Sequence, residues 1–261
     1  MAIKTRRLSA DYLASLTSVQ RPSSCSSCSE SSSGPCDGTL GYASIYGPTH
    51  TTADIQEAYC KIKYRFGNLC GYGRATPSTQ PAQSTAYFQL TQPGFGNAIQ
   101  VGVSTNRNSG MSTYERQVYL ELWVGNSIST DKDYLPLSLS DGDSVEFYLI
   151  FLASKWHIYY RLTPGSWTEF PHSPLSVSAG NVLSKLLKCS GEVENSQDDM
   201  PGTQANPCTI TGCVYSTGGG LLPAGFAPNT NVLYTPPSTC PWYVNALNST
   251  DIVIWDWCPL P

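Results

Sequence analysis

One candidate for chemistry is Gln100, an amide inside residues 97–103, which read Asn-Ala-Ile-Gln-Val-Gly-Val. Side chains alternate between the two faces of a strand, so the apolar members of this segment predict one buried face. Those members are Ile99, Val101 and Val103. Gln100 is then presented on the opposite face, with Gly102 beside it to leave room.

The second candidate is Glu192, in residues 189–197, which read Cys-Ser-Gly-Glu-Val-Glu-Asn-Ser-Gln. The same alternation places Glu192 and Glu194 on one face and Val193 on the other. A carboxyl can take a proton from water and return it to a leaving nitrogen, and a neutral amide can stabilise the oxygen that becomes negative. An amide and a carboxyl on one sheet face therefore predict hydrolysis of an amide bond.

Both segments resemble a known family. Gly-Glu-Val-x-Asn-Ser-Gln at 191–197, Asn-x-Ile-Gln-x-Gly at 97–102 and Leu-Trp at 122–123 are similar to the neprosin family of glutamic peptidases. The Gln-x-Gly piece and Leu-Ser-Asp-Gly-Asp-Ser-Val at 139–145 also resemble the fungal eqolisin peptidases, which use a Gln and Glu pair. The resemblance runs with gaps from about Gly41 to the end of the chain.

What the resemblance implies is an all-β fold, an antiparallel two-sheet β-sandwich that is jelly-roll-like, and endopeptidase activity under acidic conditions without a cofactor. It assigns Glu192 as general acid/base, Gln100 as the donor that positions water and stabilises the oxyanion, and Trp123 as a substrate-binding residue. The substrate would be a peptide or unfolded protein. The neprosin resemblance also implies a preference for cleavage after proline.

The chain departs from the neprosin pattern at two positions. That pattern has a second Glu where this chain has Gln100, which moves the dyad towards the eqolisin type and removes one like-charge pair. It is apolar where this chain has Glu194. If Glu192 and Glu194 are both partly buried, their repulsion raises one pKa; the alternative, which we favour, is that Glu194 reaches solvent or an N–H donor.

The elements that must position these residues read as strands. Alternating runs separated by Gly, Pro and Asn predict nine strands, over 39–46, 55–66, 85–91, 98–105, 116–124, 144–152, 157–162, 208–215 and 251–257. The exception to this β pattern is a helical turn, predicted over Ser178–Leu187. Many strands without a long helical period predict an antiparallel sandwich spanning residues 39–261.

Residues 1–38 are expected to form an N-terminal arm. Apolar residues at helical spacing predict a short amphipathic helix over 9–17, and a Ser-rich stretch with three cysteines follows it. The helix needs a partner surface, either the sandwich or a neighbouring subunit, so self-assembly through residues 1–40 is one alternative function for a catalytically inactive sandwich. No secretory signal is visible, which leaves a trimmed mature end or another export route.

The composition of the chain limits the classes of partner that we expect it to bind. The net charge is -4 and charged residues make up 13% of the chain, which gives no reason to expect nucleic acid. The longest apolar run, 147–153, is too short to span a bilayer. A chain of 261 residues is long enough for one all-β domain with a sizeable core.

Ten cysteines indicate an oxidising compartment and therefore a secreted, extracellular protein. Proximity in the sequence favours the pairs Cys60–Cys70, Cys208–Cys213 and Cys240–Cys258. Zinc is the competing interpretation of three further cysteines in the arm, but their ligand set is incomplete, so we expect no metal. Those cysteines are Cys25, Cys28 and Cys36.

Other chemistries have weaker support. The three histidines are far apart in the sequence, and the chain has neither a Gly-x-Ser-x-Gly nor a His-Glu-x-x-His motif. The sequence therefore does not indicate a serine triad or a zinc peptidase. Glu192 and Glu194 also fit the paired carboxyls of a glycan-active jelly roll. Three further aromatic residues are candidates to line a cleft: Trp156, Tyr159 and Trp167. Aromatic residues of strands more often pack in the core or against side chains of a neighbouring strand.

Overall fold

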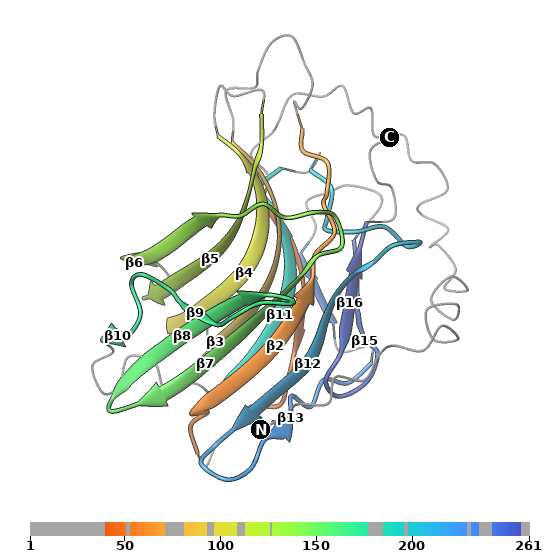
Figure 1. Ribbon diagram of the computed structural model, residues 1–261. Helices are drawn as coiled ribbons and strands as arrows, with labels where there is room; N and C mark the ends of the chain where they lie inside the picture. Colours follow the sequence, from red (N-terminus) through yellow and green to blue (C-terminus); the bar gives the residue numbers. More distant parts are fainter. Residues whose placement is uncertain are drawn as a thin grey trace.

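The structure is a computed structural model, and it describes residues 40–50, 53–70, 81–92, 97–108, 113–125, 127–176, 185–195, 198–228, 231–234 and 242–256. In these ranges the chain forms two sheets, one of seven strands and one of nine. All pairings between the named strands are antiparallel. The two layers, visible in Figure 1, confirm the all-β, antiparallel two-sheet sandwich expected from the sequence.

Sheet A, the seven-stranded sheet, carries both candidate residues. Its strands run in the order β14, β1, β11, β3, β4, β5, β6. Their bounds are β1 Gly41–Tyr46, β3 Ala82–Thr91, β4 Asn97–Arg107, β5 Glu115–Val124, β6 Ser127–Pro136, β11 Leu186–Val193 and β14 Asn231–Tyr234.

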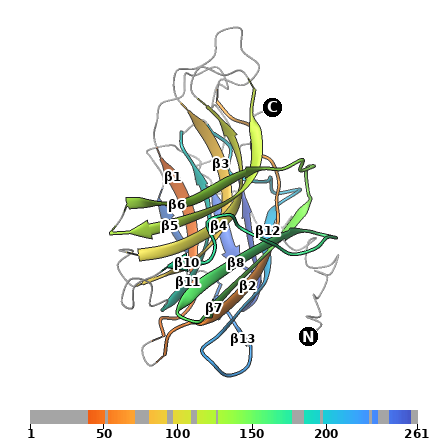
Figure 2. The ribbon, with the colours of Figure 1, turned by 60° about the vertical axis from the view of Figure 1, so that its left-hand side comes forward.

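Sheet B, the nine-stranded sheet, forms the second layer, which Figure 2 shows after a rotation of 60°. Its main path is β10, β8, β7, β2, β12, β16, β15, with β13 paired to β12 and β9 paired to β8. The bounds are β2 Glu57–Lys63, β7 Ser144–Leu152, β8 Lys155–Leu162, β9 Thr168–Glu169, β10 Leu175–Ser176, β12 Cys208–Ser216, β13 Leu222–Pro223, β15 Tyr243–Ala246 and β16 Ile252–Trp255.

The core lies between the sheets and follows from strand alternation. Ile99, Val101 and Val103 of β4 are all fully buried in it, as the alternating pattern predicts. Val193 of β11 joins them from sheet A, and residues such as Phe147 of β7 come from sheet B. Burying one such side chain contributes about 1.5–3 kcal/mol, so each strand is held in register by its apolar face.

Each of the nine predicted strands overlaps a strand of the structure, but β6, β9, β10, β13, β14 and β15 were not predicted. Leu186 and Leu187, expected to end a helical turn, instead begin strand β11. Strand β6 was not predicted, because most of its side chains are exposed and it lacks a continuous apolar face. Sheet A therefore has a polar strand at one edge that the sequence pattern did not indicate.

Two of the expected disulfides are wrong. Cys60, Cys208 and Cys213 are free, buried thiols, whereas Cys70 is disulfide-bonded. Cys208 and Cys213 both lie in strand β12. At about 3.3 Å per residue, five residues of strand separate two Cα atoms by about 16 Å, and a disulfide spans at most about 7 Å. The third expected pair, Cys240–Cys258, lies outside the described residues.

The arm and several loops are not part of the described structure. The expected helix over 9–17, the Ser-rich stretch and the three cysteines of the zinc interpretation all lie outside it. Among the residues that are described, no helix combines the length and apolar character needed to cross a membrane.

Candidate functional site

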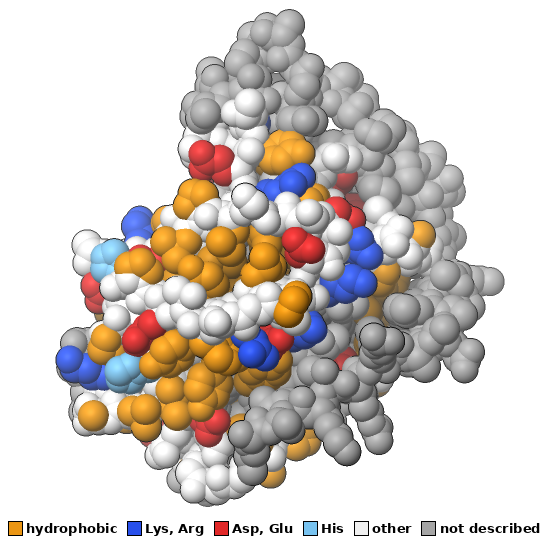
Figure 3. Space-filling model, viewed as in Figure 1, with side chains coloured by type: hydrophobic (Ala, Val, Ile, Leu, Met, Phe, Trp, Pro, Cys, Tyr) orange, Lys and Arg blue, Asp and Glu red, His pale blue; other side chains and the backbone are white. Residues whose placement is uncertain are grey.

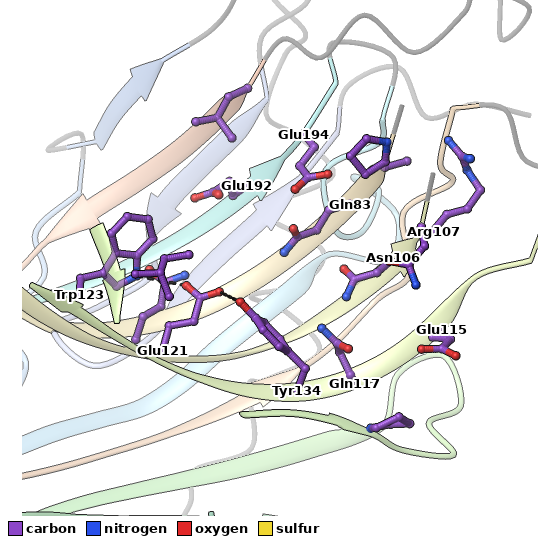
Figure 4. Close-up of a pocket in the computed structure, with 17 residues that line it drawn as sticks. Gln83, Asn106, Arg107, Glu115, Gln117, Glu121, Trp123, Tyr134, Glu192 and Glu194 are labelled. Carbon is purple, nitrogen blue, oxygen red and sulfur yellow. Dashed lines mark hydrogen bonds between the residues drawn. The ribbon is translucent and has the colours of Figure 1, made fainter. Parts of the chain in front are cut away.

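Gln100 and Glu192 lie on the face of sheet A that turns away from the core. Both line a cavity of about 580 Å³, and Trp123 lines it as well. Figure 4 shows Glu192 and Glu194 on one side of this cavity, with Trp123, Glu121 and Tyr134 on another. The structure thus places all three predicted site residues around one cavity.

The register of sheet A explains their positions. Gln100 of β4 stands opposite Glu121 of β5, in a transverse row that runs through Gln89 to Lys188 of β11. Glu192 is four residues further along β11, which corresponds to about 13 Å of strand. The amide and the carboxyl therefore belong to different rows of the same face.

Two tyrosines fill the row between them. Tyr87 of β3 and Tyr119 of β5 flank Gly102 of β4 in the sheet register. A Cβ at Gly102 would lie 2.6 Å from the Ala86 carbonyl oxygen and 2.7 Å from the Tyr119 ring. Gly102 is therefore required for close packing of Tyr119, which confirms that a glycine at this position makes room on the face.

Gln100 is held by one of these tyrosines. Its Nε2 donates a hydrogen bond to the Tyr119 hydroxyl at 3.0 Å, and both side chains are buried. A side-chain amide NH2 carries two hydrogens, so this bond fixes the orientation of the group and leaves a second donor. Burial, together with the charges of Glu121 and Glu192, raises the pKa of Tyr119, so this hydroxyl stays protonated.

Glu192 has a strongly perturbed proton affinity. Its pKa is raised to about 7, chiefly by burial; the charges of Glu121 and Glu194 also raise it, whereas Lys188 and a hydrogen bond from Tyr87 lower it. Burial disfavours the charged form of a carboxyl, so Glu192 is protonated at acidic pH. The sequence predicted repulsion from Glu194, but burial is the larger cause and Glu121 contributes more than Glu194.

Glu121 is the residue that the sequence reasoning missed. It stands opposite Gln100, lines the same cavity and accepts hydrogen bonds from the Tyr134 hydroxyl at 2.7 Å and from Trp123 Nε1 at 3.1 Å. Burial raises its pKa, whereas these two bonds lower it. Its signal was available in the strand pattern, since residues 119, 121 and 123 alternate with the apolar residues 118, 120 and 122.

Trp123 is positioned by that carboxylate. Its indole N–H donates to Glu121, and its ring is only partly exposed to solvent. The cavity wall beside it continues with Ile128 and Tyr134 of β6, which are 40% and 41% exposed. One end of the cavity is therefore apolar and aromatic, which suits contact with an apolar side chain of a ligand.

Glu194 follows the end of β11 and lines the cavity at the other end. Burial raises its pKa, and the charge of Glu121 adds to this effect. Its backbone N–H donates to the Gln83 carbonyl at 3.2 Å, so the chain continues along β3 for one more residue. Of the two roles expected for Glu194, the structure favours a partly buried carboxyl that faces the same cavity as Glu192.

The next residue of the motif, Asn195, is structural. It is fully buried, and its Nδ2 donates to the Pro81 carbonyl at 2.9 Å and to Asp198 at 2.8 Å. Asp198 in turn accepts hydrogen bonds from the backbone N–H groups of Cys70 and Gln83. This network fixes the chain immediately after Glu192 and Glu194, which explains a buried amide at this place in the motif.

The other aromatic candidates lie elsewhere. Trp156 is buried in the core, whereas Tyr159 and Trp167 belong to the outer face of sheet B, where each packs beside Tyr148. Figure 3 shows hydrophobic side chains gathered on this face over β7 and β8, with basic side chains among them. Arg161 of β8 stacks over Trp167, with its Cζ atom 4.5 Å from the ring centroid. These aromatic residues do not belong to the cavity.

The polar side chains that line the cavity carry carboxyl, amide and hydroxyl groups, the guanidinium of Arg107 and the indole N–H of Trp123. Within the described part of the chain, no three His, Cys, Asp or Glu side chains are close enough together to hold a metal ion. What the arrangement can do is move protons, through Glu192 and Glu121, and donate a hydrogen bond, through Gln100.

Comparisons with known proteins add only distant likenesses in fold. No protein-family model and no curated protein matches the chain. A functionally unknown protein from Saccharomyces cerevisiae is similar over 68% of this chain and 74% of its own, with 9% identity and a TM-score of 0.36. CG-16, a homodimeric agglutinin from chicken liver, is similar over 66% of this chain and 99% of its own, with 11% identity and a TM-score of 0.35. A peanut lectin has 9% identity and a TM-score of 0.32 over 67% of this chain and 78% of its own.

Proposed function

We propose that the protein is an acid-acting glutamic endopeptidase that hydrolyses peptide bonds of unfolded proteins, with a preference for proline before the cleaved bond. The observation that carries this proposal is that one cavity is lined by an amide, Gln100, and by a carboxyl, Glu192, whose pKa is raised to about 7. The Cys-rich composition supports secretion into an oxidising compartment.

Glu192 acts as the proton-transfer group. In the hydrolysis, the oxygen of a water molecule attacks the peptide carbonyl carbon and the C–N bond breaks, with one proton passing to the leaving nitrogen. A carboxyl with a pKa of about 7 is protonated at acidic pH and can supply that proton. Burial raises the pKa of Glu121, but its hydrogen bonds from Trp123 and Tyr134 favour the charged form, and we assign it to accept the proton of the attacking water.

Gln100 stabilises the oxygen that becomes negative. Tyr119 holds the amide in one orientation, and the remaining N–H is available to the oxyanion. A neutral amide does not titrate, so this contribution persists at acidic pH. Removing one such donor typically costs a factor of about 10² to 10³ in kcat.

Cleavage of a denatured protein and of proline-containing peptides, followed by mass spectrometry across a wide pH range, tests the proposal. We expect activity to fall as pH rises through about 7, where Glu192 loses its proton. The Glu192→Gln variant should lose cleavage with its fold intact, and Glu115→Gln, a change at the exposed rim of the same cavity, should retain it. Undiminished turnover by Glu192→Gln would remove the assignment.

Two other functions are outcomes of the same experiment. Turnover of a polysaccharide panel without peptide cleavage would instead make Glu192 part of a glycan-active site. Absence of both activities, together with subunit contacts made by residues 1–40, would favour a sandwich used in assembly.

A further inference from the structure

A buried lysine lies on the same face as the proposed dyad. Lys188 precedes Glu192 by four residues in β11, and an even spacing along a strand puts both side chains on one face. The Lys188 side chain is nearly buried, at 8% exposure. Its Nζ atom lies 5.1 Å from the ring centroid of Tyr42, 6.0 Å from that of Tyr46 and 5.0 Å from that of Tyr87. Three aromatic rings therefore surround this ammonium group.

Tyr87 connects the lysine to the glutamate. It stands opposite Ser190, the residue midway between Lys188 and Glu192 on β11. Lys188 Nζ donates a hydrogen bond of 2.7 Å to the Tyr87 hydroxyl oxygen. An ammonium group has donors only, so the hydroxyl accepts from it and keeps its own hydrogen for another acceptor. The Glu192 carboxyl lies on the same face two residues beyond Ser190, and a hydrogen bond from Tyr87 is one of the effects that lower its pKa.

We propose that Lys188 is a positioning residue for Glu192: its hydrogen bond holds the Tyr87 hydroxyl on the face that carries that carboxyl. Lys188 thereby sets the pH at which the site operates. This inference rests on the proposed function for its catalytic meaning, but the coupling between the two side chains can be measured without any substrate.

The other charges facing Glu192 act in the opposite direction. Glu121, from β5, and Glu194, which follows β11, both raise the pKa of Glu192, as burial does. Lys188 is the cation that opposes them, and burial lowers its own pKa to about 8, an effect that the charges of Glu192 and Cys189 oppose. Below about pH 8 the lysine therefore carries its charge while Glu192 titrates. The rings of Tyr42, Tyr46 and Tyr87 complete the surroundings of the lysine.

The experiment compares Lys188→Met, which keeps the length of the side chain but removes the charge, with Lys188→Arg, which restores it. The protein is labelled with ¹³C-glutamate, and the titration of the Glu192 carboxyl carbon is followed by NMR, with Glu192→Gln to assign the signal. We expect the midpoint to rise by about one pH unit in Lys188→Met, as for loss of one neighbouring opposite charge. It should return towards the wild-type value in Lys188→Arg.

Two further variants separate positioning from general damage. Tyr87→Phe removes the connecting hydroxyl and should also raise the midpoint, and its effect should be less than additive with that of Lys188→Met, because both act through one route. Lys61→Met, in strand β2 of sheet B, should leave the midpoint unchanged. If Lys188→Met does not fold, the comparison of Tyr87→Phe with wild type decides the question.

The inference and the proposed function can fail separately. A midpoint that stays within about 0.3 pH unit of wild type in both Lys188→Met and Tyr87→Phe overturns the inference, even if the protein cleaves peptides. A raised midpoint in a protein without peptidase activity supports the coupling and removes the peptidase. Where activity is present, the high-pH limb of kcat/KM should move by the same amount as the NMR midpoint.

Discussion

Replacing Glu192 by glutamine should stabilise the protein at alkaline pH and leave its stability unchanged at acidic pH. The pKa of Glu192 moves from 4.5 in the unfolded chain to about 7 in the fold, chiefly because of burial. Below pH 4.5 the carboxyl is protonated in both states and contributes nothing to the difference. As pH rises, the unfolded state loses its proton first, so the folded state becomes relatively less stable until about pH 7.

The size of this effect follows from the two pKa values. Each pH unit between 4.5 and about 7 is worth about 1.4 kcal/mol, so ionised Glu192 lowers the free energy of unfolding by about 3 kcal/mol at most. Glutamine keeps the shape and a hydrogen-bonding head without the charge. The Glu192→Gln variant should therefore gain up to about 3 kcal/mol over wild type at about pH 8, and about zero at about pH 4.

Urea denaturation of both proteins at the two pH values measures this difference. Asp198, whose pKa burial also raises to about 7, is present in both proteins and cancels in the comparison. Glu115→Gln serves as the matched control, because the carboxyl of Glu115 lies exposed at the rim of the same cavity. A difference between Glu192→Gln and wild type that is the same at both pH values would refute the claim that Glu192 is buried with a raised pKa.

Three other substitutions test the packing of side chains, two on the cavity face of sheet A and one in the core. Gly102→Ala should lower the free energy of unfolding by about 1–3 kcal/mol in the same denaturation experiment, because the new Cβ would lie 2.6 Å from the Ala86 carbonyl oxygen. An unchanged urea midpoint would contradict this contact. Tyr119→Phe should reduce kcat with little change in KM, since Gln100 loses the acceptor that orients it; equal losses in a variant distant from the cavity would argue against that role. Phe147→Ala, in the core, should cost about 3–5 kcal/mol, measured by thermal or urea unfolding, and a loss below about 1 kcal/mol would contradict its full burial.

The sequence predicted the scaffold well because strand alternation is a local property. The spacing of Ile99, Val101 and Val103 was sufficient to assign one face of β4 to the core and the other to Gln100. The same reasoning placed Val193 inward and put Glu192 and Glu194 on the cavity side. It did not predict β6, whose polar side chains carry no such pattern, although Tyr134 of that strand binds Glu121.

Sequence proximity predicted the wrong cysteine pairs, because the contacts between cysteines depend on how the strands pack and not on the local pattern. Cys60 and Cys213, on neighbouring strands of sheet B, approach Cys189 of sheet A in the core, and the Sγ atoms of Cys189 and Cys213 are 3.9 Å apart. These neighbours come from separate strands and separate sheets. Two cysteines close together in the sequence along one strand are held apart in space, which is why the expected pair Cys208–Cys213 was wrong.

The sequence alone determined which side chains share a face, because side-chain direction along a strand depends only on counting residues. Only the tertiary structure decided which of them meet. Lys188 and Tyr87 are 101 residues apart, and Gln100 and Tyr119 are 19 apart, yet each pair is joined by one hydrogen bond. Those contacts depend on the order and register of β11, β3, β4 and β5, which are set by packing of the whole sandwich. The raised pKa of Glu192 is likewise a property of the assembled face, because burial is an effect of neighbours and not of the residue itself.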